Sequence, residues 1–239
     1  MADPTDTRTA TRTRIVDVAA RLLRTDGPAA VTTRAVAEGA GVQAPTIYRL
    51  FGDKDGLLEA VAEHVLAAHV AAKTERERAA TASGSDALED LRASWLAQID
   101  FGLANPAVFR MLSEPGRMLQ SAAAQSGQRV LEGRIQRVAA TGRLRVSEAR
   151  AVALVQAAGV GTVSVLLTTA PGRRDPGLAE AMYAAVLASI LTDAPAATDG
   201  APAAAAVAFR ALAPGLVGLT DAERGLLAEW LDRVIEARP

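Results

Sequence analysis

The sequence predicts an all-α protein in which a small three-helix domain is followed by a larger helical bundle. Two observations support this fold class. Of the 239 residues, 50% are apolar but only 3% are aromatic, and alanine makes up much of the apolar fraction. Alanine has the highest helix propensity and lets helices pack closely. Apolar residues also recur at helical spacing, in segments that short Gly-, Pro- and Ser-rich stretches separate.

The composition excludes several kinds of protein. The sequence has no cysteine, which excludes a disulfide scaffold and a thiolate metal site and is typical of a reducing compartment. The first fifteen residues are polar, so we expect no signal peptide and a cytoplasmic protein. Residues 151–170 carry no charge over about the length that spans a bilayer, but Gln, Ser, Thr and Gly interrupt the run. We interpret this run as a buried helix of a bundle core or a subunit interface.

Basic residues gather near the N-terminus, although the formal net charge of the chain is only −1. Between residues 8 and 54 there are eight Arg and Lys side chains and four Asp and Glu side chains, a local excess of four positive charges. Such an excess is a modest indication of contact with a polyanion.

Two helices are predicted at the start of this basic region. The first covers residues 9–25, and Asp26-Gly27-Pro28 ends it because Gly suits the left-handed conformation and Pro cannot continue a helix. Its apolar residues share one face: Ile15, Val18, Ala19, Leu22 and Leu23. The second helix covers residues 33–40, with Thr32 as its N-cap. Its inner face consists of Val36, Ala37 and Ala40.

The stretch GVQAPTIYRLFGDK, residues 41–54, predicts a sharp turn and a third, short helix. Gly41 can adopt a positive φ, and Pro45 is tolerated in the first turn of a helix over residues 44–51. Ile47 and Phe51 are four residues apart and are expected to face inward. The outward positions are then Ala44, Pro45, Thr46, Tyr48 and Arg49. Asp53 is expected to cap a long fourth helix that runs to about residue 78.

Three short helices with a Gly turn between the second and the third form a helix-turn-helix unit, whose third helix enters the major groove of DNA. The segment TTRAVAEGAGVQAPTIYRLFGDKDGLL resembles the DNA-binding domain of the TetR/AcrR family of bacterial transcriptional repressors. The matching positions are Thr32, Val36-Ala37, Ala40-Gly41-Val42, Thr46-Ile47-Tyr48, Phe51, Lys54 and Leu57. The resemblance covers about residues 10 to 60. Two positions depart from the family pattern: Gln43 stands where a small capping residue is common, and Gly39 lies inside the second helix.

Several outward side chains are predicted to contact the DNA backbone. Thr33 and Arg34 lie in the first helical turn, where free N–H groups and the helix dipole attract a phosphate; an ordinary solvated surface is the alternative. Tyr48 is predicted to bond a phosphate through its hydroxyl, with a half-buried core position as the alternative. The resemblance implies a phosphate-binding role for Lys54.

Other side chains are predicted to read bases. Ala44, Pro45 and Thr46 are candidates for contacts with base edges and thymine methyl groups, and Arg49 for a guanine. The segment with Arg8, Arg12 and Arg14 is either an arm that reaches along the DNA or a disordered tail.

The rest of the chain predicts further helices. Their expected ranges are residues 86–104, 106–112, 117–140, 147–169, 177–192, 203–212 and 220–236. We expect a DNA-binding domain over residues 1–56, a regulatory and dimerisation domain over 57–194, and an appended C-terminal segment over 195–239. Residues 193–206 are rich in Ala and Pro and are expected to form a surface linker. Thr220 and Glu223 have the spacing of a capping box.

The resemblance implies that the helices over residues 147–169 and 177–192 pair with their copies in a homodimer, which would bind a pseudo-palindromic DNA operator. In the first of them Ala157, Ala158, Gly159 and Gly161 are expected to allow close approach. The resemblance also implies an unidentified small-molecule effector in a pocket among the middle helices. The candidate lining residues are Trp95, Phe101, Phe109, Met111 and Met118, with plain core packing as the alternative for each.

No catalytic, cofactor or metal site is predicted. His64 and His69, the only histidines, are five residues apart and therefore about 140° apart around a helix, which prevents them from sharing a metal on one face. The sequence contains no Gly-rich phosphate loop, nucleophile elbow or HExxH motif. We expect a ligand-responsive repressor; a ligand-dependent activator of the same fold and a non-specific architectural DNA-binding protein are the alternatives.

Overall fold

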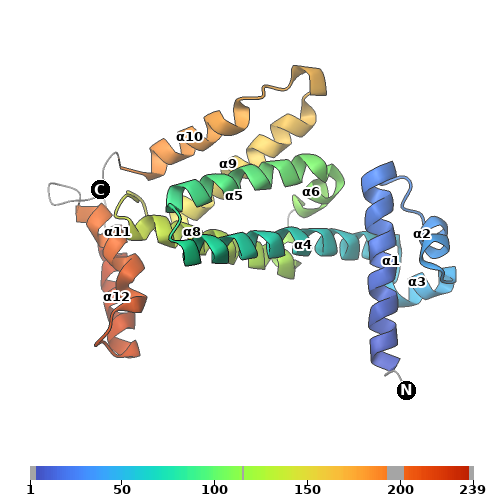
Figure 1. The fold of residues 1–239 in the computed structure, drawn as a ribbon, viewed down its shortest axis with the longest axis horizontal. Helices are drawn as coiled ribbons and strands as arrows, with labels where there is room; N and C mark the ends of the chain where they lie inside the picture. Colours follow the sequence, from blue (N-terminus) through green and yellow to red (C-terminus); the bar gives the residue numbers. More distant parts are fainter. Residues whose placement is uncertain (1–3, 115, 193–201, 237–239) are drawn as a thin grey trace. The chain divides into compact units, whose positions relative to one another are not determined.

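The computed structural model describes residues 4–114, 116–192 and 202–236, in which the regular structure is helical apart from one isolated bridge between Leu144 and Leu191. The chain divides into two compact units (Figure 1). Unit 1 comprises Met1–Ala72 and Ala104–Gly127, and unit 2 comprises Lys73–Leu103 and Gln128–Pro239. Helices α4 and α8 each contribute to both units, so each unit is described by itself below.

Unit 1 contains the predicted helix-turn-helix. It consists of α1 (Pro4–Asp26), α2 (Thr33–Ala40), α3 (Ala44–Phe51), the first part of α4 (Lys54–Ser83), α6 (Pro106–Leu112), α7 (Arg117–Gln120) and the start of α8 (Ala122–Ala140). Helices α2 and α3 lie beside α1 (Figure 1). The side chains of Ile15, Val36, Ile47 and Leu57 are fully buried and form the core that fixes these helices. The predicted inner faces of α1, α2 and α3 are therefore confirmed.

Two glycines allow the helices of unit 1 to approach closely. A Cβ on Gly39 would lie 2.7 Å from Cγ1 of Val18, so the glycine that interrupts the family pattern lets α2 pack against α1. A Cβ on Gly56 would lie 2.2 Å from the carbonyl oxygen of Phe51, so the start of α4 can pass the end of α3 only at a glycine. Gly39 thus reflects packing rather than a weak helix.

The N-terminal segment is helical. Helix α1 begins at Pro4, five residues before the expected start, and Arg8, Arg12 and Arg14 lie on it. These arginines are therefore part of a helix, so the alternative of a disordered tail is wrong for this segment, and their contact with DNA stays a prediction.

Unit 2 contains the C-terminal part of α4, α5 (Ala87–Ala104, of which Ala104 belongs to unit 1), most of α8, α9 (Glu148–Thr168), α10 (Leu178–Ile190), α11 (Pro202–Leu212) and α12 (Asp221–Glu236). Two short 3₁₀ helices lie between these helices: Pro171–Arg173 between α9 and α10, and Ala213–Gly215 between α11 and α12. The rings of Trp95 of α5 and Tyr183 of α10 are in contact, with centroids 5.7 Å apart and planes tilted by 39°. The Trp95 indole donates to the carbonyl of Ala179, and the Tyr183 hydroxyl donates to the carbonyl of Leu88. These bonds fasten α10 to α5.

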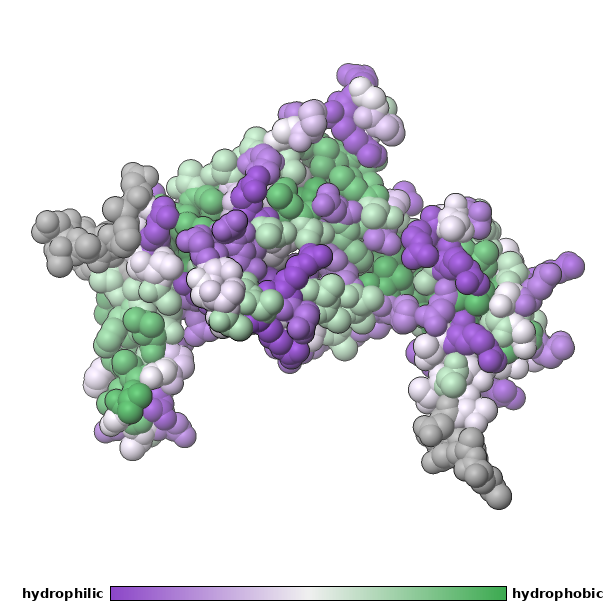
Figure 2. Space-filling model, in the orientation of Figure 1, coloured by the Kyte–Doolittle hydropathy of each residue, from purple (hydrophilic) through white to green (hydrophobic). Residues whose placement is uncertain are grey.

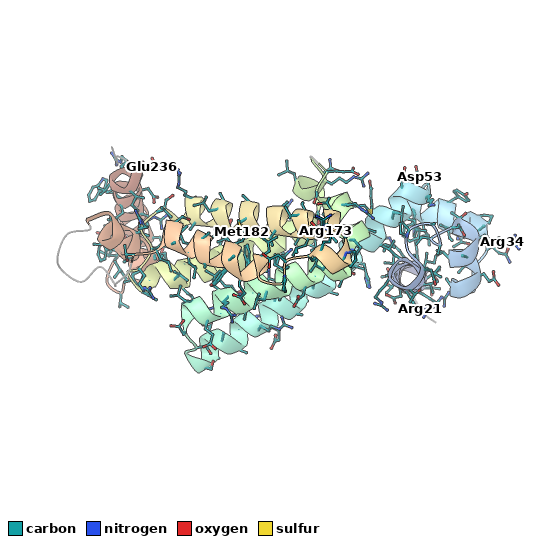
Figure 3. The ribbon with its side chains drawn as sticks, turned by 90° about the horizontal axis from the view of Figure 1, so that it is seen from above. Arg21, Arg34, Asp53, Arg173, Met182 and Glu236 are labelled. Atoms are coloured by element: carbon teal, nitrogen blue, oxygen red, sulfur yellow. The ribbon has the colours of Figure 1, made fainter. Side chains whose placement is uncertain are left out.

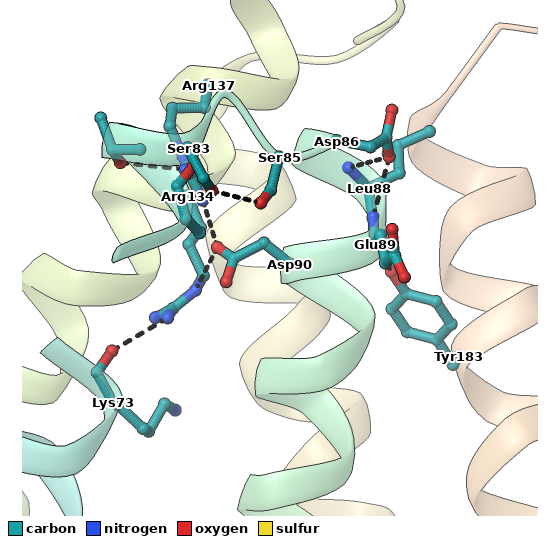
Figure 4. Close-up of polar contacts among 12 residues, drawn as sticks. Lys73, Ser83, Ser85, Asp86, Leu88, Glu89, Asp90, Arg134, Arg137 and Tyr183 are labelled. Atoms are coloured by element: carbon teal, nitrogen blue, oxygen red, sulfur yellow. Dashed lines mark hydrogen bonds and ion pairs between the residues drawn. The ribbon is translucent and has the colours of Figure 1, made fainter. Parts of the chain in front are cut away.

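A buried charged cluster joins α4, α5 and α8 in unit 2 (Figure 4). The guanidinium of Arg134, only 1% exposed, donates through Nε to Asp90 at 2.8 Å and through Nη2 to the carbonyl of Lys73 at 3.0 Å. Arg137 also pairs with Asp90. Burial, followed by the positive charge of Arg134, lowers the pKa of the Lys73 ammonium to about 8. A single buried carboxylate thus holds two guanidinium groups, and Lys73 lies beside them.

Two boundaries in the second half differ from the prediction. The helix expected over residues 117–140 is broken at Ser121, whose extended backbone separates α7 from α8 and whose hydroxyl donates to Glu63 at 2.6 Å. The linker expected over residues 193–206 ends earlier, because α11 begins at Pro202 and Ala206 is buried. Residues 193–201 lie outside the described part of the chain. The capping box is confirmed, since Glu223 accepts from the backbone N–H of Thr220 at 2.8 Å.

Helix α9 is partly buried. By length and composition it is apolar enough to cross a membrane, a test that core helices of soluble proteins also pass, and 39% of its most apolar stretch is buried. Gly159 faces the core of unit 2, where its Cβ position lies 3.6 Å from the ring of Trp95. Contrary to the expectation, it does not lie on an outer contact face. Ala157 and Gly161 are exposed.

Helix α12 has one apolar face exposed to solvent. Leu226, Trp230 and Val234 recur every four residues on this face, and each is between 43% and 55% exposed. Figure 2 shows apolar side chains gathered over this helix. No residue of α12 is buried.

Candidate nucleic-acid interface

The turn between α2 and α3 has the geometry that the sequence predicts. The side chain of Thr32 accepts from the backbone N–H of Ala35 at 3.1 Å and caps α2. Gly41 adopts φ +63° at the C-cap, and the N–H of Val42 donates to the carbonyl of Ala37 at 3.0 Å. This left-handed residue turns the chain directly into α3 because glycine adopts a positive φ without a steric cost.

Helix α3 is fixed from behind by Ile47, which is fully buried, while its opposite face is open. Tyr48 is 52% exposed, and Pro45 and Arg49 are also exposed. Thr46 and Ala44 are half-buried beside them. The structure therefore brings the five outward residues of the prediction to one exposed surface of a short helix.

The N-terminus of α3 has no side-chain cap. Gln43 makes no capping hydrogen bond, as expected from its departure from the family pattern, and Pro45 occupies the first turn. Backbone N–H groups that helix ends leave without a helical partner are available to an anion.

The remaining phosphate candidates flank α3. Thr33 and Arg34 lie in the first turn of α2, which contains no acidic residue, and the Arg34 side chain is exposed. Figure 3 shows Arg34 directed outward from its helix. Lys54 is exposed at the start of α4, where Asp53 accepts from the N–H of Gly56 at 2.8 Å and caps the helix. Cationic side chains and the positive ends of helix dipoles at these helix N-termini create a surface that is favourable to phosphate.

The sequence does not predict one contact in this region. The guanidinium carbon of Arg12 lies 5.1 Å above the centroid of the Phe51 ring, a cation–π distance. Arg12 thus holds the end of α3 to α1 and is an additional exposed cation beside the reading helix. The excess of arginine near the N-terminus indicated a basic surface, but it did not indicate that Arg12 contacts Phe51.

The five candidate effector residues are distributed over the two units. Trp95 is only 3% exposed, lies in the core of unit 2 and packs on Tyr183. Phe101 belongs to unit 2, whereas Phe109 and Met111 are half-buried in unit 1. The side chain of Met118 lies outside the described part. The geometry of Trp95 is that of a core residue.

The exposed face of α3 and the turn before it define a class of protein: a helix-turn-helix DNA-binding domain joined to a helical bundle. Residues 15–61 match the sequence model of the bacterial regulatory proteins of the tetR family. The chain is also similar to the HTH-type transcriptional regulator BetI of Paraburkholderia phytofirmans, with 37% identity over 89 residues that cover 37% of this chain and 44% of BetI. The chain therefore spans less than half the length of this relative.

Solved structures share the fold over most of the chain. A TetR/AcrR-family regulator from Thermobifida fusca has a TM-score of 0.57 and 23% identity, covering 74% of this chain and 96% of its own. RolR in complex with resorcinol has a TM-score of 0.55 and 20% identity, covering 85% of this chain and 95% of its own. The tetR-family match thus covers residues 15–61, and the solved structures show that the chain as a whole shares the fold of these regulators.

Proposed function

We propose that the protein is a homodimeric transcriptional repressor that binds a pseudo-palindromic DNA operator and is released by a small-molecule effector. The observation that carries this proposal is the open face of α3, with Tyr48 and Arg49 exposed opposite the buried Ile47. A short helix of this kind, anchored from behind and open in front, fits a major groove. Release from DNA on ligand binding is typical of the TetR family, whose sequence model the N-terminal domain matches.

The roles of the surface residues follow from their positions. Thr33, Arg34, Tyr48 and Lys54 hold phosphates, and Ala44, Pro45, Thr46 and Arg49 meet base edges. Arg12 adds a cation next to this surface. Phosphate contacts set orientation and affinity, whereas base contacts set sequence preference.

The domain division that we propose has the DNA-binding domain over residues 1–56, the regulatory and dimerisation domain over residues 57–194, and an appended segment over residues 195–239. The protein acts in the cytoplasm without a cofactor or catalytic step.

The dimer in this proposal forms through α9 and α10. Small residues are exposed on both helices at helical spacing, and they would allow four helices to pack closely across a two-fold axis. They are Ala157, Gly161, Ser164 and Thr168 on α9 and Ala181, Ala184, Ala185 and Ala188 on α10. Val160 and Val165 add apolar area on α9 that a partner would cover.

The test is selection of bound sequences from a random pool of double-stranded DNA at near-physiological salt. Enrichment of one inverted repeat supports specific dimeric recognition and supplies the operator. Binding without enrichment, with a steep dependence on salt, would favour the architectural alternative. Transcription from a promoter that carries the selected operator then separates repressor from activator. A folded, dimeric protein that binds no DNA contradicts the proposal.

A further inference from the structure

Unit 2 contains a cavity of about 610 Å³ between α8, the start of α9 and the hairpin formed by α11 and α12. Val152 of α9, Val207 of α11 and Ile235 of α12 line it with apolar surface. The volume lies within the range of roughly 300–1,000 Å³ that is usual for small-molecule sites. Trp95, Phe101, Phe109 and Met111 do not line this cavity.

The charged groups that line the cavity are mostly carboxylates. Glu132 comes from α8, Glu148 from α9, and Asp232 and Glu236 from α12, whose end is labelled in Figure 3. Among the described residues of the lining Arg210 is the one basic side chain, and its Nε already pairs with Asp232 at 2.9 Å. Four carboxylates and one guanidinium give this described lining a formal charge of −3.

Glu148 is the residue whose hydrogen bonding is incomplete. Its Oε1 is buried and has no hydrogen-bond partner among the described residues. Burial raises the pKa of Glu148, the positive charge of Arg210 opposes this effect, and the negative charge of Asp232 adds to it. The position of Glu148 in the first turn of α9 suits the helix dipole, but the dipole does not supply the buried Oε1 with a hydrogen-bond donor.

We propose that this cavity binds a small organic cation, a molecule that carries one ammonium group on an apolar body. The ammonium group would pair with the carboxylate of Glu148 and offset part of the negative charge of the lining, and the apolar body would pack on Val152, Val207 and Ile235. The hairpin that follows the core helices would then be one wall of a binding site. This inference goes beyond the proposed function and does not depend on DNA binding.

The experiment compares three ligands that share one apolar body and differ in charge: phenylbutylamine, phenylbutanol and phenylbutanoate. Each is titrated into the full chain, without DNA, in a calorimeter at pH 7.5. We expect the amine to bind about tenfold or more tightly than the alcohol, because a hydrogen bond to a charged group contributes more than a neutral one. We expect no binding of the carboxylate. Equal binding of amine and alcohol, or no binding of the amine, overturns the proposal.

Variants locate the site. Glu148→Gln keeps the shape and removes the charge, so the preference for the amine over the alcohol should disappear. This variant should fold, because a carboxyl group whose pKa is raised in the folded state costs stability once the pH exceeds its unfolded pKa, and Gln removes that cost. Glu229→Gln, on an exposed part of α12 outside the lining, is the matched control and should keep the preference. A preference that survives Glu148→Gln contradicts the assignment.

Ala149→Leu provides a second, steric test, since Ala149 lines the cavity from the first turn of α9. The larger side chain should weaken the binding of amine and alcohol together while Glu148 is retained. Unchanged binding of both ligands would place them outside this cavity and overturn the proposal.

Discussion

Tyr48 and Arg49 are adjacent on α3 and both are exposed, yet their substitution should have different effects on DNA binding. Tyr48→Phe removes one hydroxyl and should weaken binding to every DNA sequence by about 1 kcal/mol, the contribution of one hydrogen bond to phosphate. Arg49→Ala should instead relax the preference at one base position of each half-site, by about 1–3 kcal/mol. Fluorescence anisotropy with the selected operator and its single-base variants measures both effects.

Arg173→Ala is the control for these two variants, because Arg173 is an exposed arginine in unit 2, outside the helix-turn-helix. It should leave affinity and base preference unchanged. An unchanged base preference in Arg49→Ala would make that residue a backbone contact.

Lys73 imposes a stability cost that depends on pH. The pKa of Lys73 is about 8 in the folded protein, against the usual value of 10.5 that applies to the unfolded chain. The folded state therefore binds fewer protons than the unfolded state at pH values between these two pKa values. The stability of the wild type should therefore rise with pH across this window, and the full cost, on the order of 3 kcal/mol, applies below about pH 8. Lys73→Met should raise the free energy of unfolding by about 1–3 kcal/mol at pH 7 and by much less at pH 10.

Urea denaturation of both proteins at the two pH values tests this expectation. Lys73 donates to Gln98 at 3.3 Å, and Met loses that bond, which is why the expected gain is smaller than the full cost. A Met variant that is less stable at pH 7 would mean that the ammonium charge is required within the cluster around Asp90.

At the scale of single elements, the helix-turn-helix could be predicted closely because local chemistry determines it. Thr32 caps α2, Gly41 turns the chain and Ile47 faces inward, and each of these depends on residues within one or two turns. The cation–π contact of Arg12 and the paired arginines of Asp90 could not be predicted, since they depend on how distant helices are rotated about their axes. The break at Ser121 was missed for the same reason, because its hydroxyl bonds Glu63 of another helix.

Gly39 should resist replacement despite its position inside α2. Alanine would favour the helix by about 1 kcal/mol, but its Cβ would lie 2.7 Å from Cγ1 of Val18, and overpacking of this kind costs about 1–3 kcal/mol. Gly39→Ala should therefore lower the stability of unit 1, measured by hydrogen exchange in α1 and α2. Adding Val18→Ala should reverse part of the loss that is due to the clash, as a double-mutant cycle would reveal.

Gly225→Ala is the matched control for this substitution. Gly225 lies in the exposed α12, and a Cβ at this position has no neighbour within 4 Å, so Ala should stabilise the helix by about 0.5–1 kcal/mol. Equal gains at both glycines would contradict the packing role of Gly39.

At the scale of the whole molecule, the proposed function requires two α3 helices to act together. A single short helix contacts too few phosphates and bases to bind one site tightly, whereas a two-fold dimer binds two half-sites about one DNA turn apart. Linking two such contacts commonly raises affinity by about 10²–10⁴. In the dimer that we propose, the exposed small residues of α9 and α10 form the contact surface, because side chains this small let helix backbones approach closely.

Ala157→Arg and Ala184→Arg test this dependence, since each places a long charged side chain on the exposed face of α9 or α10. Both variants should sediment as monomers at micromolar concentration and lose at least about a hundredfold in affinity for the inverted repeat. The loss for an isolated half-site should be small, because the helix-turn-helix is unchanged. Ala79→Arg, on an exposed position of α4, should remain dimeric with full affinity. If the α9 and α10 variants stay dimeric, the subunits must associate through another surface, and the exposed Leu226, Trp230 and Val234 of α12 would be the next to substitute.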